Sequence, residues 1–210
     1  MNEVKKKRRM YFAEPPLFDL ALDDILGLAL DYFEGLKVIT KAEFAKLSAK
    51  KRWKSFTIAR RESKFLIDDI RVRLVDHLKE GKAIDEFVSN IDSYLDTLGF
   101  TKLSPYHLET VFRTNSANGY GAGRLTIMNR LGDDEFPYRQ VLAVGDNRTR
   151  DAHMELDGYV AEANDPVWSW LRTPFSYNCR CKISPVHIDE GLTPSGYTPD
   201  VMGKAGFDFL

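Results

Sequence analysis

Apolar residues recur at helical spacing through most of the first 130 residues of the chain. The clearest stripe ends at Gly99 and consists of Ile84, Phe87, Val88, Ile91, Leu95 and Leu98. Residues three and four positions apart share one face of an α-helix, so this spacing predicts a helix with one apolar side. Such a helix is stable only when its apolar side packs against another element or a partner. The pattern therefore predicts a packed helical scaffold.

Further helices are predicted over residues 17–36 and 67–78 and from residue 105 onward. Gly35 and Gly81 lie where the first two should end, because glycine readily takes the backbone conformation that closes a helix. Ser104 and Pro105 provide the third with an N-cap and a proline at its first helical position. None of these helices carries a residue spacing typical of a chemical site.

The sequence Thr40-Lys-Ala-Glu43 is a capping box. In this motif the threonine hydroxyl and the glutamate carboxylate each accept a hydrogen bond from a backbone N–H that the helix leaves free. It predicts the start of a basic helix that continues through Phe44, Leu47, Trp53 and Phe56.

The character of the chain changes after Arg130. Residues 131–137 have the composition of a turn, and residues 138–144 form a short run that predicts a strand ending at Gly145. Residues 180–186 predict a second strand, and Asp157-Gly158 a turn between them. The expected fold class is α+β, with about five helices in the N-terminal part and a small mixed C-terminal domain with a short sheet.

The composition narrows the class of protein without indicating a partner. The 210 residues are 43% hydrophobic, enough for one sizeable core or two small ones, and the formal net charge is −1. No apolar run approaches the roughly 20 residues of a membrane span, and Pro15-Pro16 interrupts the segment where a secretory signal needs an apolar core. The two cysteines are separated by one residue, so a disulfide between them would close almost no loop. Synthesis in a reducing cytosol is expected.

An unbroken basic run precedes the first helix and consists of Lys5, Lys6, Lys7, Arg8 and Arg9. Such a run is typical of a solvated tail, and the alternative is an arm that contacts DNA or an acidic partner.

The densest group of polar residues is Asp146-Asn-Arg-Thr-Arg-Asp-Ala-His153. If Thr149 caps a short helix, Arg150 and His153 share one face of it. The first interpretation is structural: the arginines Arg148 and Arg150 and the acids of this segment, such as Asp146, lock a strand-to-helix corner. The second is a site for an anion or nucleotide. The third makes His153 a general base or a metal ligand.

Cys179 and Cys181 are two residues apart, so on a strand both sulfur atoms point to the same face. Together with His153, and with His187 or Asp157 as a fourth ligand, they allow a tetrahedral zinc site. The other interpretation is that both cysteines are small buried hydrophobic residues. A redox role has little support, because no neighbouring group is suited to resolving a disulfide.

Two other features have mainly structural interpretations. The segment Gly119-Tyr-Gly-Ala-Gly123-Arg124 lacks the spacing of a dinucleotide-binding loop, so its glycines either admit another backbone or break the helix that begins at Ser104. Trp168 and Trp170 are expected to cover the core of the small domain. The sequence contains no Walker loop, nucleophile elbow or paired C-x-x-C motif.

Taken together, several of these motifs resemble one family, the phage Mu F-like head morphogenesis or minor head proteins of tailed bacteriophages and prophages. The resemblance runs from about Leu108 to Val186. Its most specific part is the block D-x-R-T-R-x-x-H followed at this distance by N-C-R-C. The residues that carry it are Arg113, Asp146, Arg148, Thr149, Arg150, His153, Gly158, Asp165, Trp168, Asn178, Cys179 and Cys181. Two departures are Asn115, where many members have glutamate, and the end of the chain at Leu210, where the family often continues.

The resemblance implies a protein present in few copies at the portal vertex of the procapsid, incorporated during head assembly and linked to DNA packaging or delivery. With the patterns above, it gives the expected division into a basic extended arm (1–16), a helical docking region (17–103), the shared domain (104–188) and an irregular tail (189–210). The expected partners are the phage portal protein and the inner capsid or scaffold, with double-stranded DNA as a further candidate and no membrane. Synthesis is expected in the bacterial cytoplasm.

Three functional hypotheses follow. The first is a virion assembly protein without enzymatic activity, whose polar cluster holds a compact module together. The second is an effector nuclease or nucleotide-modifying toxin, with His153 as base and Arg148 or Arg150 as phosphate clamp. The third is a zinc-stabilised interaction module. An open cleft around His153 would favour the second, and a buried His153 would favour the first or the third.

Overall fold

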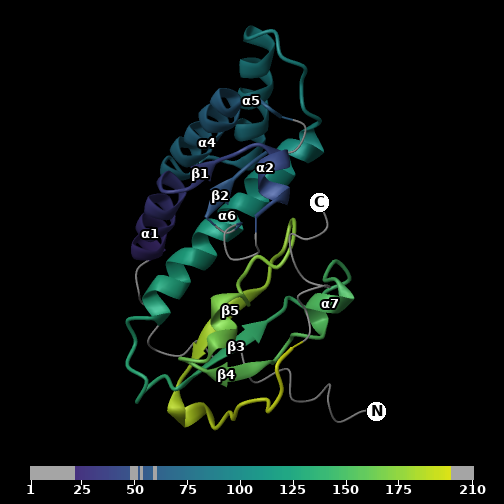
Figure 1. Ribbon diagram of the computed structural model, residues 1–210. Helices are drawn as coiled ribbons and strands as arrows, with labels where there is room; N and C mark the ends of the chain where they lie inside the picture. Colours follow the sequence, from purple (N-terminus) through teal and green to yellow (C-terminus); the bar gives the residue numbers. More distant parts are fainter. Residues whose placement is uncertain (1–21, 48–51, 53, 59–60, 200–210) are drawn as a thin grey trace.

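The computed structural model describes residues 22–47, 52, 54–58 and 61–199. It confirms the α+β class: helices dominate the N-terminal part, and a three-stranded antiparallel sheet lies in the C-terminal part (Figure 1). The predicted basic arm and the end of the predicted tail lie outside the described residues. No helix in the described ranges is long and apolar enough to cross a membrane.

Four helices build the N-terminal core. They are α1 (Leu22–Glu34), α4 (Lys64–Lys79), α5 (Ile84–Thr97) and α6 (Pro105–Met128). Each buries most of the face that the periodicity predicted, and the largest fully buried side chains include Phe33, Leu74, Phe87, Ile91 and Leu108. The exception is Leu98 at the end of the α5 stripe, which is 43% exposed. The predicted helix ends are confirmed at Gly81 and Gly99, which both have the positive φ angle that glycine adopts without strain.

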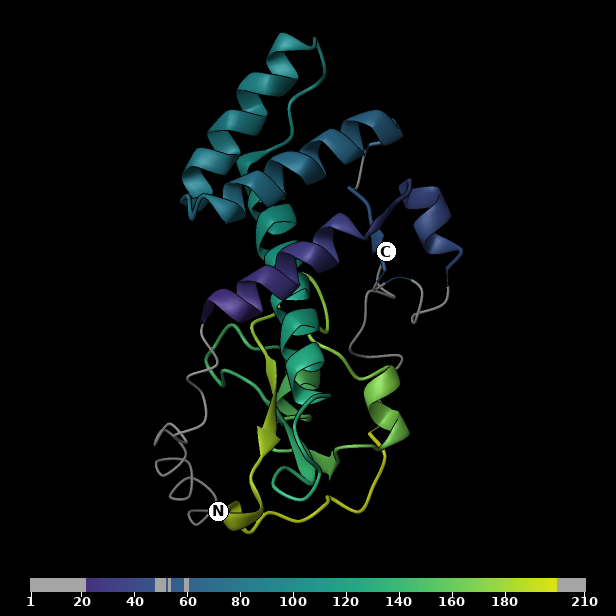
Figure 2. The same ribbon diagram turned by 90° about the vertical axis from the view of Figure 1, so that its left-hand side faces the viewer.

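Helix α6 is long enough to join the two parts of the molecule. Its N-terminal half packs on α4 and α5, and its C-terminal half reaches the sheet, while α1 crosses it obliquely (Figure 2). The glycine-rich segment does not break α6. Instead, Gly123 faces the carbonyl oxygen of Ile25 in α1, and Gly121 faces the carbonyl of Thr173. The first of the two interpretations of these glycines, close approach of another backbone, is therefore confirmed.

The helix predicted from Thr40 through Phe56 is wrong at its far end, and its stretch over 48–51 and Trp53 lies outside the described residues. The capping box forms as expected, but helix α2 (Lys41–Ala45) is only five residues long. Phe56 lies instead in strand β2 (Ser55–Phe56), which pairs in parallel with β1 (Lys37–Val38). The physical reason is burial: Phe56 is fully buried in the N-terminal core, and the strand pairing brings it there.

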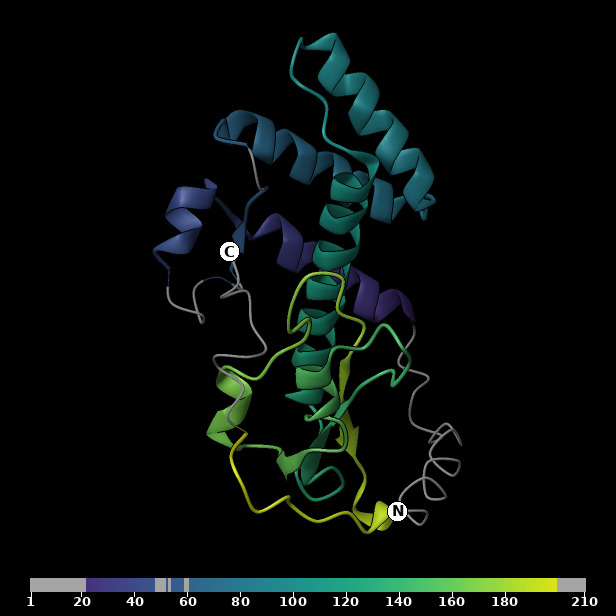
Figure 3. The ribbon, with the colours of Figure 1, turned by 90° about the vertical axis from the view of Figure 1, so that its right-hand side faces the viewer.

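The sheet of the C-terminal part has the order β4-β3-β5, with β3 (Tyr138–Leu142) in the centre, β4 (Val160–Glu162) and β5 (Lys182–Val186). Both predicted strands are thus confirmed. The short helix α7 (Asp151–Met154) and the 3-10 turns η2 (Pro166–Ser169) and η3 (Ile188–Glu190) complete this part, which surrounds the lower end of α6 (Figure 3). Trp168 is buried in its core and Trp170 packs against it, as predicted.

Candidate functional site

The polar residues of the C-terminal part meet where α7, the loop before β5 and helix α6 come together. His153 lies on α7 and is 2% exposed, with its ring edge-on to Phe175 at a centroid distance of 5.5 Å. Cys179 is also buried, and Cys181 is partly buried. The chain therefore brings an imidazole and two thiols together in one place, although His153 is more than twenty residues away from the cysteines in sequence.

The imidazole of His153 lies directly against both cysteines. Its Nδ1 atom is 3.8 Å from Sγ of Cys179 and 3.7 Å from Sγ of Cys181. Its Nε2 atom lies on the opposite side, 3.2 Å from Oγ of Ser176. The backbone N–H of Cys181 donates to Sγ of Cys179 at 3.4 Å. Both ring nitrogens of His153 are therefore engaged within the protein.

The two thiols have opposite tendencies to ionise. A hydrogen bond from the Cys181 thiol lowers the pKa of Cys179, and the contact with His153 adds to this effect. The same bond between the cysteines, together with burial, raises the pKa of Cys181. A thiolate on Cys179 is thus stabilised by the groups around it.

An ion pair at the edge of this cluster joins two distant loops. Arg180 donates two hydrogen bonds to the carboxylate of Asp146, and the same carboxylate accepts from the backbone N–H of Arg148 and from the Thr149 hydroxyl. The hydrogen bond from Arg180 is the main cause that lowers the pKa of Asp146 well below its usual range. The corner is thus locked by an aspartate–arginine pair, as the structural interpretation predicted.

The arginine in this pair is not one of the two that were expected to lock the corner, Arg148 and Arg150. The partner of Asp146 is Arg180, while Arg148 and Arg150 are exposed. Thr149 does not cap α7: the N-cap is Arg150, which makes no side-chain cap hydrogen bond, and Thr149 instead donates to Asp146. The reason is that the Asp146 carboxylate already draws residues 146–149 into a turn of their own, so α7 begins one residue later than expected.

The loop that carries the cysteines is fixed to helix α6 through Asn178. This residue has a φ angle of 54°, in the left-handed region that asparagine tolerates better than most residues. Its backbone N–H donates to the hydroxyl of Thr114, and its side-chain amide donates to the hydroxyl of Thr110. The two threonines are one helical turn apart on α6, so a rigid helix face positions the loop.

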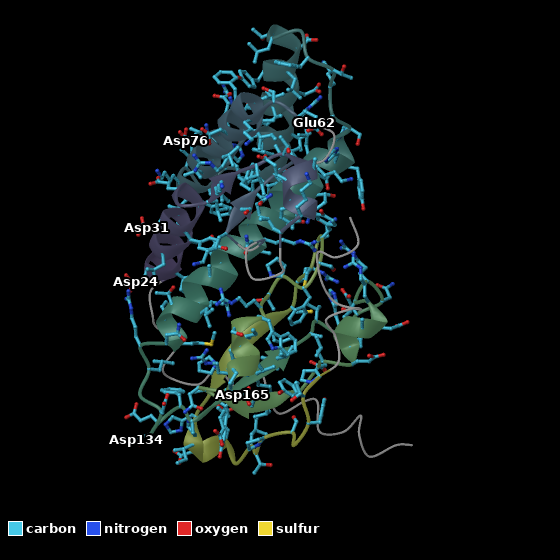
Figure 4. All side chains as sticks on the ribbon, viewed as in Figure 1. Asp24, Asp31, Glu62, Asp76, Asp134 and Asp165 are labelled. Carbon is cyan, nitrogen blue, oxygen red and sulfur yellow. The ribbon has the colours of Figure 1, made fainter. Side chains whose placement is uncertain are left out.

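Three other predicted residues hold the surrounding backbone. Gly158 has a φ angle of 84° in the turn that leads into β4. Asp165 caps η2 by accepting from the N–H of Val167 at 2.7 Å, and it lies in the sheet-containing part of the molecule (Figure 4). The indole N–H of Trp168 donates to the carbonyl of Glu162. These residues support the fold around the cluster and do not enter it.

Other predicted residues lie elsewhere. Arg113 is exposed on α6 and pairs with Glu109 one turn away, so it is not part of the cluster. His187 packs its ring on Phe136 beyond the far end of β5, away from the cysteines. Asp157 accepts a hydrogen bond from the backbone N–H of Ala143 and lies outside the group of three possible metal ligands. The predicted fourth ligands are therefore not brought into place.

Several residues that build the site were not predicted from the sequence. Ser176, Thr110 and Thr114 contact its members directly, and Arg180 supplies the ion pair. A weak signal was present for two of them, because the four-residue spacing of Thr110 and Thr114 places both hydroxyls on one helix face. For Ser176, no local pattern in the sequence indicated a contact with a histidine 23 residues earlier.

Comparison with known proteins agrees with the resemblance noted in the sequence. The family model described as Phage Mu protein F like protein matches residues 68–184, more than half of the chain. The match begins in α4, earlier than the expected Leu108, and includes His153, Cys179 and Cys181. No solved structure matches the chain.

Two curated relatives carry related names. The Mu-like prophage FluMu F protein of Haemophilus influenzae is 30% identical over 142 residues, which cover 62% of this chain and 34% of that protein. A protein F of Escherichia phage Mu, named provisionally for capsid assembly, is 30% identical over 146 residues, covering 62% of this chain and 33% of the relative. The match thus spans about a third of the length of each relative. By the match of the family model, this chain belongs to the phage Mu protein F like family.

Proposed function

We propose that this chain acts in the assembly of the head of a tailed bacteriophage, as a minor head protein at the portal vertex. The observation that carries the proposal is the family match over residues 68–184, which includes the whole polar cluster. The name of the phage Mu relative, which refers to capsid assembly, supports the same role. The burial of the cluster supports an architectural use of these residues.

The rival nuclease or toxin hypothesis needs a solvent-open imidazole beside a phosphate clamp. His153 is 2% exposed, and its two ring nitrogens face the cysteines and Ser176. A general base must reach the proton that it removes, so this arrangement supports the assembly role over catalysis by His153.

The helical part offers a surface for docking on a larger assembly. Phe65 and Val72 are seven residues apart on one face of α4, and they are 72% and 43% exposed. Exposed large apolar side chains commonly mark contact surfaces when they share one face. We assign this face to the contact with the portal or inner capsid.

Co-expression with the portal protein from the same genome tests the assignment. We expect the two proteins to co-elute in size-exclusion chromatography, and the double variant Phe65→Asp, Val72→Asp to elute alone. The matched control is Tyr197→Asp, which replaces an aromatic residue in the C-terminal part that is 55% exposed and should leave co-elution intact. Failure of the unchanged protein to bind the portal protein would contradict the proposal.

The basic run from Lys5 to Arg9 lies outside the described residues, and its role follows from charge alone. We assign it to contact with packaged DNA, since lysine and arginine that neutralise phosphates release counterions and make binding depend on salt. Removing residues 1–9 should weaken binding to duplex DNA and flatten the plot of log affinity against log salt by about 0.9 per lost phosphate contact. Unchanged DNA binding after this deletion would refute the arm's role.

A further inference from the structure

The side chains of His153, Cys179 and Cys181 converge with the separations that a tetrahedral metal centre requires. Nδ1 lies 3.8 and 3.7 Å from the two sulfur atoms, and all three ligand atoms are within 4.8 Å of one another. At bond lengths of about 2.0–2.1 Å to nitrogen and 2.3 Å to sulfur, a tetrahedral zinc ion separates these atoms by about 3.6 Å. The two observed nitrogen–sulfur separations exceed this value by only one or two tenths of an ångström.

The surroundings of the three side chains match the needs of a metal site. The hydroxyl of Ser176 lies 3.2 Å from Nε2 of His153. When the ring carries its proton on Nε2, this N–H can donate to the serine hydroxyl, and the lone pair of Nδ1 is directed at the sulfur atoms. Metal-binding histidines usually have such a partner on their second nitrogen, because it fixes the tautomer and the ring orientation. The N–H of Cys181 donates to Sγ of Cys179, as is favourable for a metal-bound thiolate.

Contacts of the neighbouring residues hold the ligand-bearing segments in place. Asn178, in its left-handed conformation, is tied to α6 by Thr114 and Thr110 and directly precedes Cys179. The ion pair between Arg180 and Asp146 closes the other side. These contacts pre-position two cysteines that would otherwise be separated from His153 by a long stretch of chain, which reduces the entropy lost on binding a metal.

The donor atoms indicate which metal the site takes. Two thiols and an imidazole are soft to borderline ligands, whereas Mg²⁺ and Ca²⁺ require oxygen ligands. Zinc is the divalent ion most often bound by cysteine and histidine together. We propose that His153, Cys179 and Cys181 bind one Zn²⁺ ion, which cross-links α7 to the loop before β5.

A tetrahedral ion needs a fourth ligand. Among the described residues, no histidine, cysteine or carboxylate joins the group of three. Cys181 is partly exposed, so we assign the fourth position to a water molecule.

The first test is metal analysis of the full chain, purified without chelators under reducing conditions. We expect about one zinc per chain. Replacing zinc by Co²⁺ should produce the thiolate charge-transfer absorption and the intense visible bands of tetrahedral cobalt. Purified chain without zinc that also gives no such cobalt spectrum would overturn the proposal. A disulfide between the cysteines, with no metal and no free thiols, would overturn it as well.

Variants separate metal ligation from simple packing. Cys179→Ser and His153→Gln should each abolish stoichiometric zinc, and His187→Ala should retain it, because His187 lies away from the cluster. Since the first two variants risk misfolding, Ser176→Ala provides an independent readout: it keeps all three ligands and should weaken zinc affinity by about 10- to 100-fold in competition with a chromophoric chelator. Unchanged affinity in Ser176→Ala, or loss of zinc in His187→Ala, would contradict the assigned ligand set.

Discussion

Arg180 donates two hydrogen bonds, of 2.7 and 2.6 Å, to the carboxylate of Asp146, which lies 34 residues earlier in the chain. Asp146 belongs to the turn after β3 that leads into α7, and Arg180 lies between the two cysteines. The pair therefore joins the segment that carries His153 to the segment that carries Cys179 and Cys181. Planar, two-bond pairing of this kind fixes orientation as well as distance, because guanidinium and carboxylate match in shape.

A double-mutant cycle on this pair should detect a small favourable coupling. Both side chains are 37% exposed, and exposed ion pairs contribute little to stability because solvent screens them. We expect Asp146→Ala and Arg180→Ala to lower the free energy of unfolding slightly, and the double variant to be less destabilised than the sum of the two. Urea unfolding of all four proteins measures this coupling. Additive losses would show that the pair does not stabilise the fold.

The same carboxylate predicts how stability depends on pH. Because the hydrogen bond from Arg180 lowers the pKa of Asp146 in the folded protein, the contribution of Asp146 is fully present above its unfolded pKa, which is about 4. The contribution is lost as the pH falls toward the lower pKa of the folded state. The stability difference between the unchanged protein and Asp146→Asn should therefore be largest near neutral pH and shrink below about pH 4. A difference that stays constant with pH would argue against this cause.

Asn178 predicts an unusual order of stability for two substitutions. Both Asn178→Gly and Asn178→Ala lose the hydrogen bond to Thr110, but only alanine is strained at a φ of 54°. The left-handed conformation costs an ordinary residue roughly 1–2 kcal/mol. We expect the alanine variant to be about 1 kcal/mol less stable than the glycine variant in thermal or urea unfolding.

Asn90 provides the matched control. It is exposed within helix α5, where alanine is favoured over glycine by about 1 kcal/mol. The order of the two variants should therefore reverse at this position. If alanine were the better residue at both positions, the left-handed backbone at Asn178 would not be maintained in solution.

Replacing a glycine by alanine should have opposite effects on stability at two positions of the crossing helices α1 and α6. A methyl group on Gly123 would lie 2.8 Å from the carbonyl oxygen of Ile25, a backbone atom that cannot rotate away. Overpacking of this kind costs about 1–3 kcal/mol, so we expect Gly123→Ala to lower stability despite the better helix propensity of alanine. At Gly27, on α1, nothing lies within 4 Å of an added methyl group.

Gly27→Ala should accordingly raise the free energy of unfolding by about 0.5–1 kcal/mol. The two variants can be compared by their midpoints of thermal unfolding. A stabilising effect of Gly123→Ala would mean that α1 and α6 are farther apart in solution than in the structure.

The sequence by itself determined the features that depend on near neighbours in the chain. The apolar stripe that begins at Ile84, the capping box at Thr40 and the N-cap at Ser104 all act within a few residues. Each appears in the structure as predicted, except that Leu98 at the end of the stripe is exposed. The motif spacing from Asp146 to Cys181 was also sufficient to indicate the family, which the family model confirms. Local hydrogen bonding and periodic burial require no knowledge of the path of the chain.

Only the tertiary structure decided which distant groups meet. The spacing of Asp146 and the nearby arginines indicated a local ion pair, yet the chain returns after β4 and presents Arg180 instead. Phe56 was predicted in a helix but lies in a strand, because its burial in the core outweighed the local helical signals. The meeting of His153 with both cysteines depends on how α6, α7 and β5 pack, and such long-range contacts are set by the closure of the whole fold, which residue spacing does not encode.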